Sequence, residues 1–270
     1  VLCESGEQLL GDALAARLSR HGTASPQFPL LIKWIDAHEN LSIQVHPPDG
    51  HPRLPPGETG KTECWWVVAA EPGAEIYLGL RRGIDRAAFI HELTRGTADR
   101  CLNVLSARPG DFFFVPAGTP HAIGAGVLLA EIQQTSDTTF RLFDSNRIDS
   151  TPGRPRDLQI EPALDSINFQ AEPPVTSKVS SGTGNRSTTL LSFDQCPHFK
   201  VDWRRLTTPE KTGNPGRATV IICLSGGGRL NGGDEAVEFK AGDCALLPGI
   251  GHFNCEPETV CEFLEAQIGS

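Results

Sequence analysis

The chain has 270 residues, of which 39% are hydrophobic and 21% are charged, and its formal net charge is -9. These proportions are ordinary for a globular protein of one or two domains. The acidic balance argues against nucleic acid as a partner, because that surface needs an excess of Lys and Arg. No apolar run reaches the ~20 residues of a membrane-spanning helix, and no signal-peptide pattern opens the sequence. We therefore expect a cytoplasmic protein that binds neither membranes nor nucleic acid.

The first half of the chain alternates between short apolar runs and turn signals. Apolar residues recur at helical spacing over Gly6–Gly22, which predicts a helix. Pro29–Ala37 is an apolar run with Lys33 inside it. The proline-rich stretch Pro47–Gly60 predicts a loop, because proline cannot donate to a sheet ladder. Two strands are predicted over Thr62–Ala70 and Glu75–Leu80, with a Pro-Gly turn between them.

Further short elements follow at similar spacing. Asp85 precedes a predicted helix that ends at Arg95, since Asp is a favoured N-cap residue. Strands are predicted over Phe112–Val115, Val127–Gln134 and Thr139–Phe143. Many short strands separated by turn residues favour an all-β sandwich or barrel.

The last third partly repeats the first half. The text GDFFFVPAGTPH has an echo in GDCALLPGIGH, which ends at His252. Between the two, the apolar pattern weakens and Pro, Ser, Thr and Gly become frequent. We therefore predict a barrel unit over residues 1–150, a connecting segment over 151–186 and a second, degenerate unit over 187–270. No Gln-x-His or Lys-x-Glu element accompanies His252, so a second metal site is not expected there.

Four potential metal ligands occur in the first unit. Alternate residues of a strand share a face, so Gln44 and His46 point the same way in SIQVH, as do Lys61 and Glu63 in KTE. His121 ends the motif VPAGTPH. Two imidazoles, a carboxylate and an amide oxygen suit a borderline divalent cation such as zinc. None of the eight cysteines repeats at a zinc-knuckle spacing.

Three stretches carry a resemblance to a known family. They are LIKWIDAHENLSIQVHPPD, GKTECWWVVAAEPGAEIYLG and GDFFFVPAGTPHAIGAGVLLAEIQQTSDTTFRLFD. In this order, over about half the chain, they resemble the type I mannose-6-phosphate isomerases, particularly the short bacterial form. The resemblance implies a mainly β fold of two cupin-like (jelly-roll) barrel units with a few short helices, one zinc ion and no redox cofactor. Relative to the family, one or two opening strands are missing, so we expect that the chain lacks its native N-terminus.

The resemblance also implies an activity. It is the zinc-dependent interconversion of mannose 6-phosphate and fructose 6-phosphate by proton transfer through an enediol(ate), a step of mannose metabolism. The positions that match catalytic residues of the family are Arg141, Lys61, Glu131 and Asp137. Which of them serves as the base stays open. Without the resemblance, Glu131 and Arg141 would be interpreted as a buried ion pair.

The phosphate of the substrate needs cationic or hydroxyl partners in an acidic protein. Candidates are Lys33, Ser42, which shares the face of Gln44, and Arg147. Lys33 is also interpretable as a snorkelling strand residue. His51, in the proline-rich loop, is expected to be solvated. The sequence carries no signal for an oligomeric state.

Two other functions compete with the isomerase. One is a non-catalytic cupin that binds a sugar phosphate, which calorimetry would reveal as binding without turnover. The other is a cupin oxygenase, which needs a redox metal and open coordination. The presence of Gln44 among the ligands and of Lys61 beside them makes the oxygenase less favoured.

Overall fold

The computed structural model describes residues 28–144, 156–172, 174, 176–179, 182–233 and 235–269. The helix predicted over Gly6–Gly22 lies outside these residues, as does Arg147. The described chain is mainly β and forms two compact units, the first over Leu30–Lys178 and the second from Val179 onward. Each unit contains two antiparallel sheets, and none of these described sheets closes on itself.

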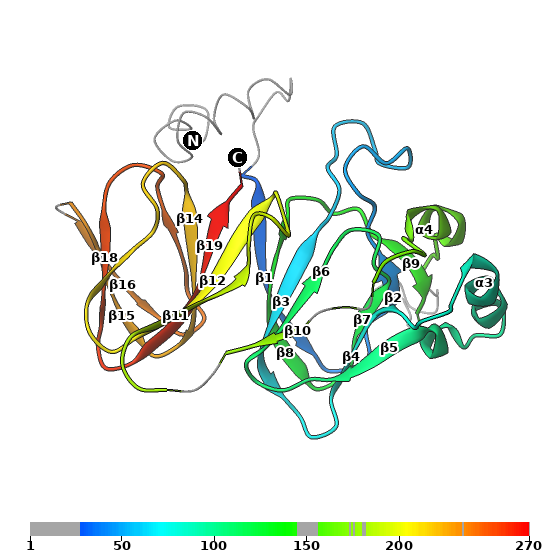
Figure 1. Cartoon of the computed structure of the whole chain (residues 1–270), viewed down its shortest axis with the longest axis horizontal. Coiled ribbons are helices and arrows are strands. Elements are labelled where there is room, and N and C mark those ends of the chain that lie inside the picture. The colour runs from blue at the N-terminus through cyan, green and yellow to red at the C-terminus, as the bar shows by residue number, and fades with distance from the viewer. Residues whose placement is uncertain are drawn as a thin grey trace. The chain divides into compact units, whose positions relative to one another are not determined.

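The first unit is built from two five-stranded sheets (Figure 1). One sheet has the order β1 (Leu30–Ala37), β8 (Val127–Gln134), β3 (Glu63–Ala70), β6 (Asp111–Val115) and β10 (Thr176–Lys178). The other has the order β5 (Leu102–Ser106), β4 (Glu75–Leu80), β7 (His121–Ile123), β2 (Ile43–Val45) and β9 (Phe140–Phe143). The strands predicted over Glu75–Leu80 and Val127–Gln134 coincide with β4 and β8 at both ends.

The core between these two sheets follows from strand alternation. Trp65 and Val67 of β3 and Leu129 of β8 are fully buried and pack against residues of the facing sheet. Two residues further along the same inward face, the apolar side chains give way to Glu63 on β3 and Glu131 on β8, which are also buried. The polar residues therefore gather at one end of an otherwise apolar interior.

Two helices cover the other face of the sheet that contains β2 and β9 (Figure 1). Helix α3 spans Arg86–Thr94, with Asp85 as its N-cap, and a 3-10 turn, η1 (Ala98–Cys101), follows it. Helix α4 spans Ile160–Ser166. Leu164 of α4 packs in one cluster with residues of α3, β2 and β9.

Helix α4 and strand β10 lie in the segment predicted as a connection between two units. Helix α4 was not predicted, because its seven residues give too short a periodic pattern. The first compact unit ends only at Lys178. The predicted division at residues 150 and 186 stays a prediction.

The second unit repeats the strand pairing of the first. Its larger sheet has the order β11 (Arg186–Leu191), β12 (Phe199–Leu206), β19 (Cys261–Ile268), β14 (Thr219–Ser225) and β17 (Cys244–Leu247). Its smaller sheet has the order β13 (Glu210–Thr212), β18 (Phe253–Pro257), β15 (Gly227–Gly232) and β16 (Glu235–Lys240). Strand β17 follows a Gly-Asp turn and pairs with β14, as β6 does with β3. His252 is exposed.

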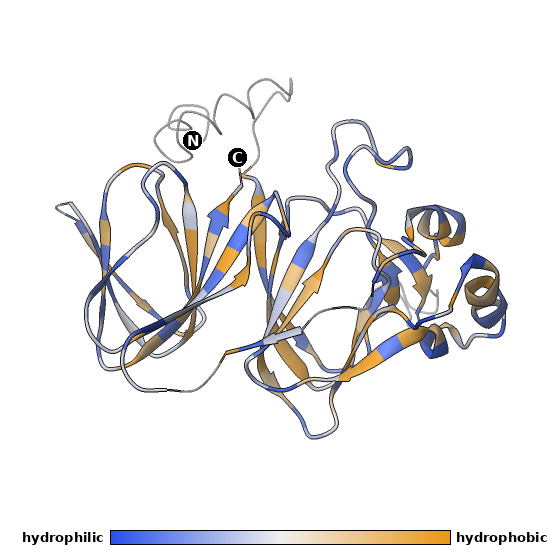
Figure 2. Cartoon of the chain, in the orientation of Figure 1, coloured by the Kyte–Doolittle hydropathy of each residue, from blue (hydrophilic) through white to orange (hydrophobic). Residues whose placement is uncertain are grey.

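Apolar residues are concentrated on the strands and polar residues on the connections (Figure 2). The chain between β2 and β3 contains no helix or strand over residues 47–60, as the sequence predicts for Pro47–Gly60. Among the helices that the structure describes, none has the length and apolar character to cross a membrane.

If α4 is an integral part of the first unit, truncating its buried face must destabilise the protein. We expect Leu164→Ala to lower the free energy of unfolding by about 2 to 4 kcal/mol, because the side chain is 3% exposed in a packed cluster. Leu158→Ala, just before the helix, is the matched control and should cost about 0.5 kcal/mol or less, since Leu158 is 46% exposed. Urea unfolding curves measure both. Equal effects of the two substitutions would contradict the assignment.

Candidate active site

Three buried side chains from different strands converge at the polar end of the first unit. His46 follows β2, Glu63 opens β3 and His121 opens β7. Each offers one ligand atom, and these atoms lie within 4.8 Å of one another. All three side chains are at most 1% exposed. Among the described residues this is the only such group of His, Cys, Asp and Glu.

Backbone carbonyls orient both imidazoles. His46 Nδ1 lies 3.0 Å from Thr138 O and His121 Nδ1 lies 2.9 Å from Thr119 O. A carbonyl only accepts, so each Nδ1 carries the proton and donates it. The Nε2 lone pairs are therefore left to face Glu63, at 3.5 Å for His46 and 3.4 Å for His121. This tautomer is the one that binds metals through Nε2.

The electrostatics of the site keep both histidines neutral near pH 7. Burial lowers the pKa of His121 from 6.5 to about 4. Burial, together with the positive charge of Lys61, lowers the pKa of His46 well below its ordinary value. Burial also raises the pKa of Glu63, although the Lys61 ammonium opposes that shift.

The Glu63 carboxylate is the least satisfied group of the site. It is fully buried, and neither of its oxygens accepts a well-aligned hydrogen bond. The Lys61 ammonium lies 2.9 Å from Glu63 Oε2 and 3.1 Å from His46 Nε2. A buried carboxylate is costly unless it is paired or coordinates a metal. The donor set therefore fits a divalent cation held by two imidazoles and one carboxylate.

Gln44, the fourth predicted ligand, adjoins this group. It stands opposite His121 and Arg141 in the sheet register. Its amide nitrogen lies 3.2 Å from His121 Nε2, whereas its amide oxygen faces Ser42 Oγ at 3.5 Å. A half-turn of the amide would exchange the two atoms and turn the oxygen toward His121.

Glu131 is held by partners that the sequence analysis did not assign to it. Trp65 Nε1 donates to Glu131 Oε2 at 3.0 Å, and Lys33 Nζ lies 3.2 Å from Glu131 Oε1. Lys33 also donates to Gln133 Oε1 at 2.6 Å. The ion pair considered between Glu131 and Arg141 is not present; Lys33 takes that place. Burial, and next the charge of Glu63, raise the pKa of Glu131.

The two remaining catalytic candidates differ in position. Arg141 is half-buried, and no hydrogen bond or ion pair engages its guanidinium among the described residues; its Nε is buried without a partner. Asp137 is exposed in the loop before β9 and is not brought into contact with the metal group.

The three residues predicted to bind the substrate's phosphate also differ in their surroundings. Ser42 is buried beside Gln44, Lys33 is engaged by Glu131, and Arg147 lies outside the described residues. His51 is not part of the group of metal-ligand atoms, and its Nε2 lies 3.3 Å from the backbone oxygen of Asp165.

Sequence reasoning missed Trp65 and Gln133 as supporting residues. Their signal was available, because they share the strand faces of Glu63 and Glu131.

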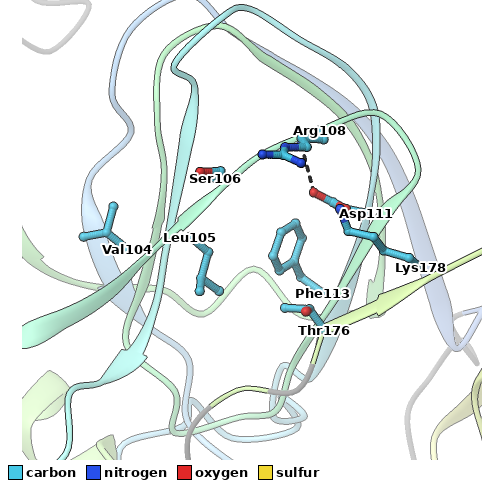
Figure 3. Close-up of a pocket in the computed structure, with 8 residues that line it drawn as sticks. All are labelled: Val104, Leu105, Ser106, Arg108, Asp111, Phe113, Thr176 and Lys178. Carbon is cyan, nitrogen blue, oxygen red and sulfur yellow. Dashed lines mark hydrogen bonds and ion pairs between the residues drawn. The ribbon is translucent and has the colours of Figure 1, made fainter.

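A cavity of about 250 Å³ lies elsewhere in the first unit, between β5, β6 and β10 (Figure 3). Leu105 and Phe113 form its apolar part, and Arg108, Asp111 and Lys178 stand at one side. None of the predicted site residues lines it.

Comparison with known proteins places the chain in a family. It is 36% identical to mannose-6-phosphate isomerase ManA of Bacillus subtilis over 237 residues, which cover 87% of this chain and 74% of that protein. It is 37% identical to mannose-6-phosphate isomerase of Streptococcus mutans over 224 residues, which cover 83% and 69% of the two chains. The chain belongs to the mannose-6-phosphate isomerase family. The resemblance drawn from its three motifs is thereby confirmed, and the chain is a member of an enzyme family.

A solved structure supports the same family. The crystal structure of mannose 6-phosphate isomerase from Bacillus subtilis superposes with a TM-score of 0.80 at 28% identity, covering 99% of this chain and 81% of that one. No protein-family model matches the chain.

The lowered pKa of His121 makes a testable statement about the metal-free protein. As pH falls below 6.5, the unfolded state takes up a proton first, so stability is full above 6.5 and is lost toward about 4. From about pH 7.5 to about pH 4.5, the free energy of unfolding should fall by about 2 kcal/mol more in the wild type than in His121→Asn. The asparagine keeps a donor for Thr119 O but does not titrate. The free energy of unfolding is measured against pH in the presence of chelator. If it falls equally in the wild type and in His121→Asn, the lowered pKa of His121 is refuted.

Proposed function

We propose that this member of the family interconverts mannose 6-phosphate and fructose 6-phosphate, using one zinc ion held by His46, Glu63, His121 and Gln44. The observation that supports it best is the convergence of two neutral imidazole nitrogens on a fully buried carboxylate whose one close cation is the Lys61 ammonium. Thiolates take no part in this group, and two imidazoles with one carboxylate are a common zinc set. Gln44 is included because a half-turn of its amide would turn its oxygen toward the same point.

The reaction moves a proton between two adjacent carbons of an open-chain sugar, so negative charge develops on its oxygens. When bound, the zinc ion supplies electrostatic stabilisation of that charge. Lys61 and Arg141 are proposed to add to it. The Lys61 ammonium already lies within about 3 Å of two ligand atoms. The half-buried Arg141 guanidinium, with no described partner, offers a planar pair of donors to sugar oxygens.

Three groups are candidates for the base that moves the proton. Glu131 has a pKa raised by burial, which suits a base near neutral pH. Both of its oxygens are engaged, by Trp65 and Lys33, so it must exchange a partner to reach a substrate. Lys61 is nearest to the ligand atoms but is proposed to act in its charged form. Asp137 is exposed and would need the loop before β9 to bring it inward.

Recognition of the phosphate is proposed for Lys33, Ser42 and Arg147. Lys33 keeps 36% of its side chain exposed while it pairs with Glu131, so one donor direction remains accessible. Ser42 presents its hydroxyl beside Gln44. In a chain with a net charge of -9, a phosphate depends on such a local group of donors.

The architecture is proposed to be a pair of cupin-like barrels, of which the first is catalytic and the second is degenerate. Two facing antiparallel sheets in each unit, and the repeated pairing around β3 and β14, support this proposal. Membership in an isomerase family makes a binding protein without turnover the less favoured alternative.

Removal of the metal tests the central claim. Treating the protein with a chelator until no metal is detected should abolish isomerisation of both sugar phosphates, and one equivalent of zinc should restore it. A coupled assay in each direction and elemental analysis measure these quantities. Full turnover by verified metal-free protein would reject the zinc-dependent mechanism. A zinc-loaded protein that binds the sugars without turnover would favour the non-catalytic alternative.

The role of Arg141 requires a loss of turnover without a loss of structure. We expect Arg141→Ala to lower kcat/KM by about a hundred-fold or more, because an interaction with developing charge is removed. Arg82→Ala is the control, since Arg82 is exposed on the connection before α3. Zinc content and unfolding midpoint should stay unchanged in both. If Arg141→Ala retains wild-type kcat/KM, the guanidinium has no part in the reaction.

A further inference from the structure

The loop Pro47–Gly60 joins the two halves of the metal group. His46 immediately precedes it, and Lys61 and Glu63 follow it. The distance between the His46 imidazole and the Glu63 carboxylate therefore depends on how the two ends of this loop are held together. The sheet register alone does not fix that distance, because β2 and β3 belong to different sheets.

The two ends meet in a tight backbone contact. Lys61 N donates to Pro47 O at 3.1 Å. Gly60 N donates to the Asp49 carboxylate, at Oδ1, over 2.6 Å. A Cβ added to Gly60 would stand 2.4 Å from Asp49 N and 2.5 Å from Pro48 C, so only glycine permits this approach. The Asp49 carboxylate thus binds the backbone amide next to Lys61.

Gln134 extends this contact to strand β8. Its amide nitrogen donates to Asp49 Oδ1 at 3.2 Å, and its amide oxygen accepts from Thr62 N at 2.9 Å. Its own backbone nitrogen donates to Thr62 O at 3.1 Å. Gln134 is 7% exposed, so these bonds are largely shielded from water. Asp49, Gly60, Thr62 and Gln134 form a connected set of bonds on both sides of Lys61.

We propose that Asp49 is a positioning residue of the active site. Through Gly60 N and Gln134 it fixes the backbone of residues 60–62, and thereby sets the Lys61 ammonium and the Glu63 carboxylate against His46. This inference rests on the proposed function, because it concerns the zinc group of that site. The carboxylate acts through backbone and amide partners and is assigned no contact with the reacting atoms.

The test compares Asp49→Ala, Asp49→Asn and the control Asp85→Ala. Asp85 is also an exposed aspartate, and its Oδ1 accepts from the backbone nitrogen of Ala88 at 2.8 Å, but it caps α3. The control therefore deletes a carboxylate-to-backbone bond of the same kind in the same unit. Three quantities are measured on the full chain: the zinc dissociation constant by chelator competition, the hydrogen-exchange rate of the Gly60 amide in metal-free protein, and kcat with KM.

We expect Asp49→Ala to weaken zinc binding by roughly ten-fold or more, as supporting residues of metal ligands do. The Gly60 amide should exchange faster, and kcat should fall more than KM rises. Asp49→Asn keeps an oxygen acceptor for Gly60 N and should recover much of the zinc affinity and amide protection. Asp85→Ala should leave the zinc dissociation constant and the Gly60 exchange rate at wild-type values.

Wild-type zinc affinity in Asp49→Ala would overturn the inference, and so would an equal loss of affinity in Asp85→Ala, which would indicate general destabilisation. If Asp49→Ala does not fold, Asp49→Asn must show an intermediate zinc affinity with partly protected Gly60, and unchanged values there reject the proposal. A wild-type protein that binds zinc but does not isomerise the sugars would count against the proposed function alone, because the zinc and exchange measurements do not depend on turnover.

Discussion

The buried carboxylate of Glu63 is the constraint on which the site depends. Removing an ionised carboxylate from water costs several kcal/mol unless opposite charge and hydrogen bonds replace the lost solvent. Lys61 supplies one cation at 2.9 Å, but neither carboxylate oxygen accepts an aligned hydrogen bond. The neighbouring imidazoles are oriented with their Nε2 lone pairs toward the same carboxylate, so they add electron density and not a donor. Such an arrangement is unfavourable by itself and becomes favourable when a cation is bound.

The second unit shows what the same strand pairing looks like without this constraint. Thr219 on β14 pairs with β19 and β17 in the register that Glu63 on β3 has with β8 and β6. A hydroxyl thus stands where the first unit has its buried carboxylate. Glu265 on β19 pairs with Arg204 at 2.8 Å and accepts hydrogen bonds from Thr212 Oγ1 and Gly213 N. Its charge is satisfied inside the protein, and no ligand group forms among the described residues there.

The sequence was sufficient where a local pattern determines the structure. The strands β4 and β8 follow from short apolar runs bounded by turn residues, the cap at Asp85 follows from side-chain chemistry, and the family follows from three motifs. It was insufficient where contacts join distant residues. The pairing of Lys33 with Glu131 depends on the register of β1 against β8, which no local pattern sets. Helix α4 is held by packing on the sheet and not by its own periodicity. The Gln44 amide shares the predicted face, yet its orientation depends on Ser42 and His121.

The site also has a mechanical consequence for the first unit. Glu63 belongs to one sheet, whereas His46 follows β2 and His121 opens β7 of the other, and the two sheets do not close into a continuous ladder. A cation bound by these three groups would therefore link the sheets at their polar end. Because the ligands come from separate strands and an ordered site requires all of them, the free energy of metal binding adds to the free energy of folding. A slip of one residue in β3 would turn Glu63 to the opposite face and remove that link. The register of β3 is therefore one of the conditions for metal binding.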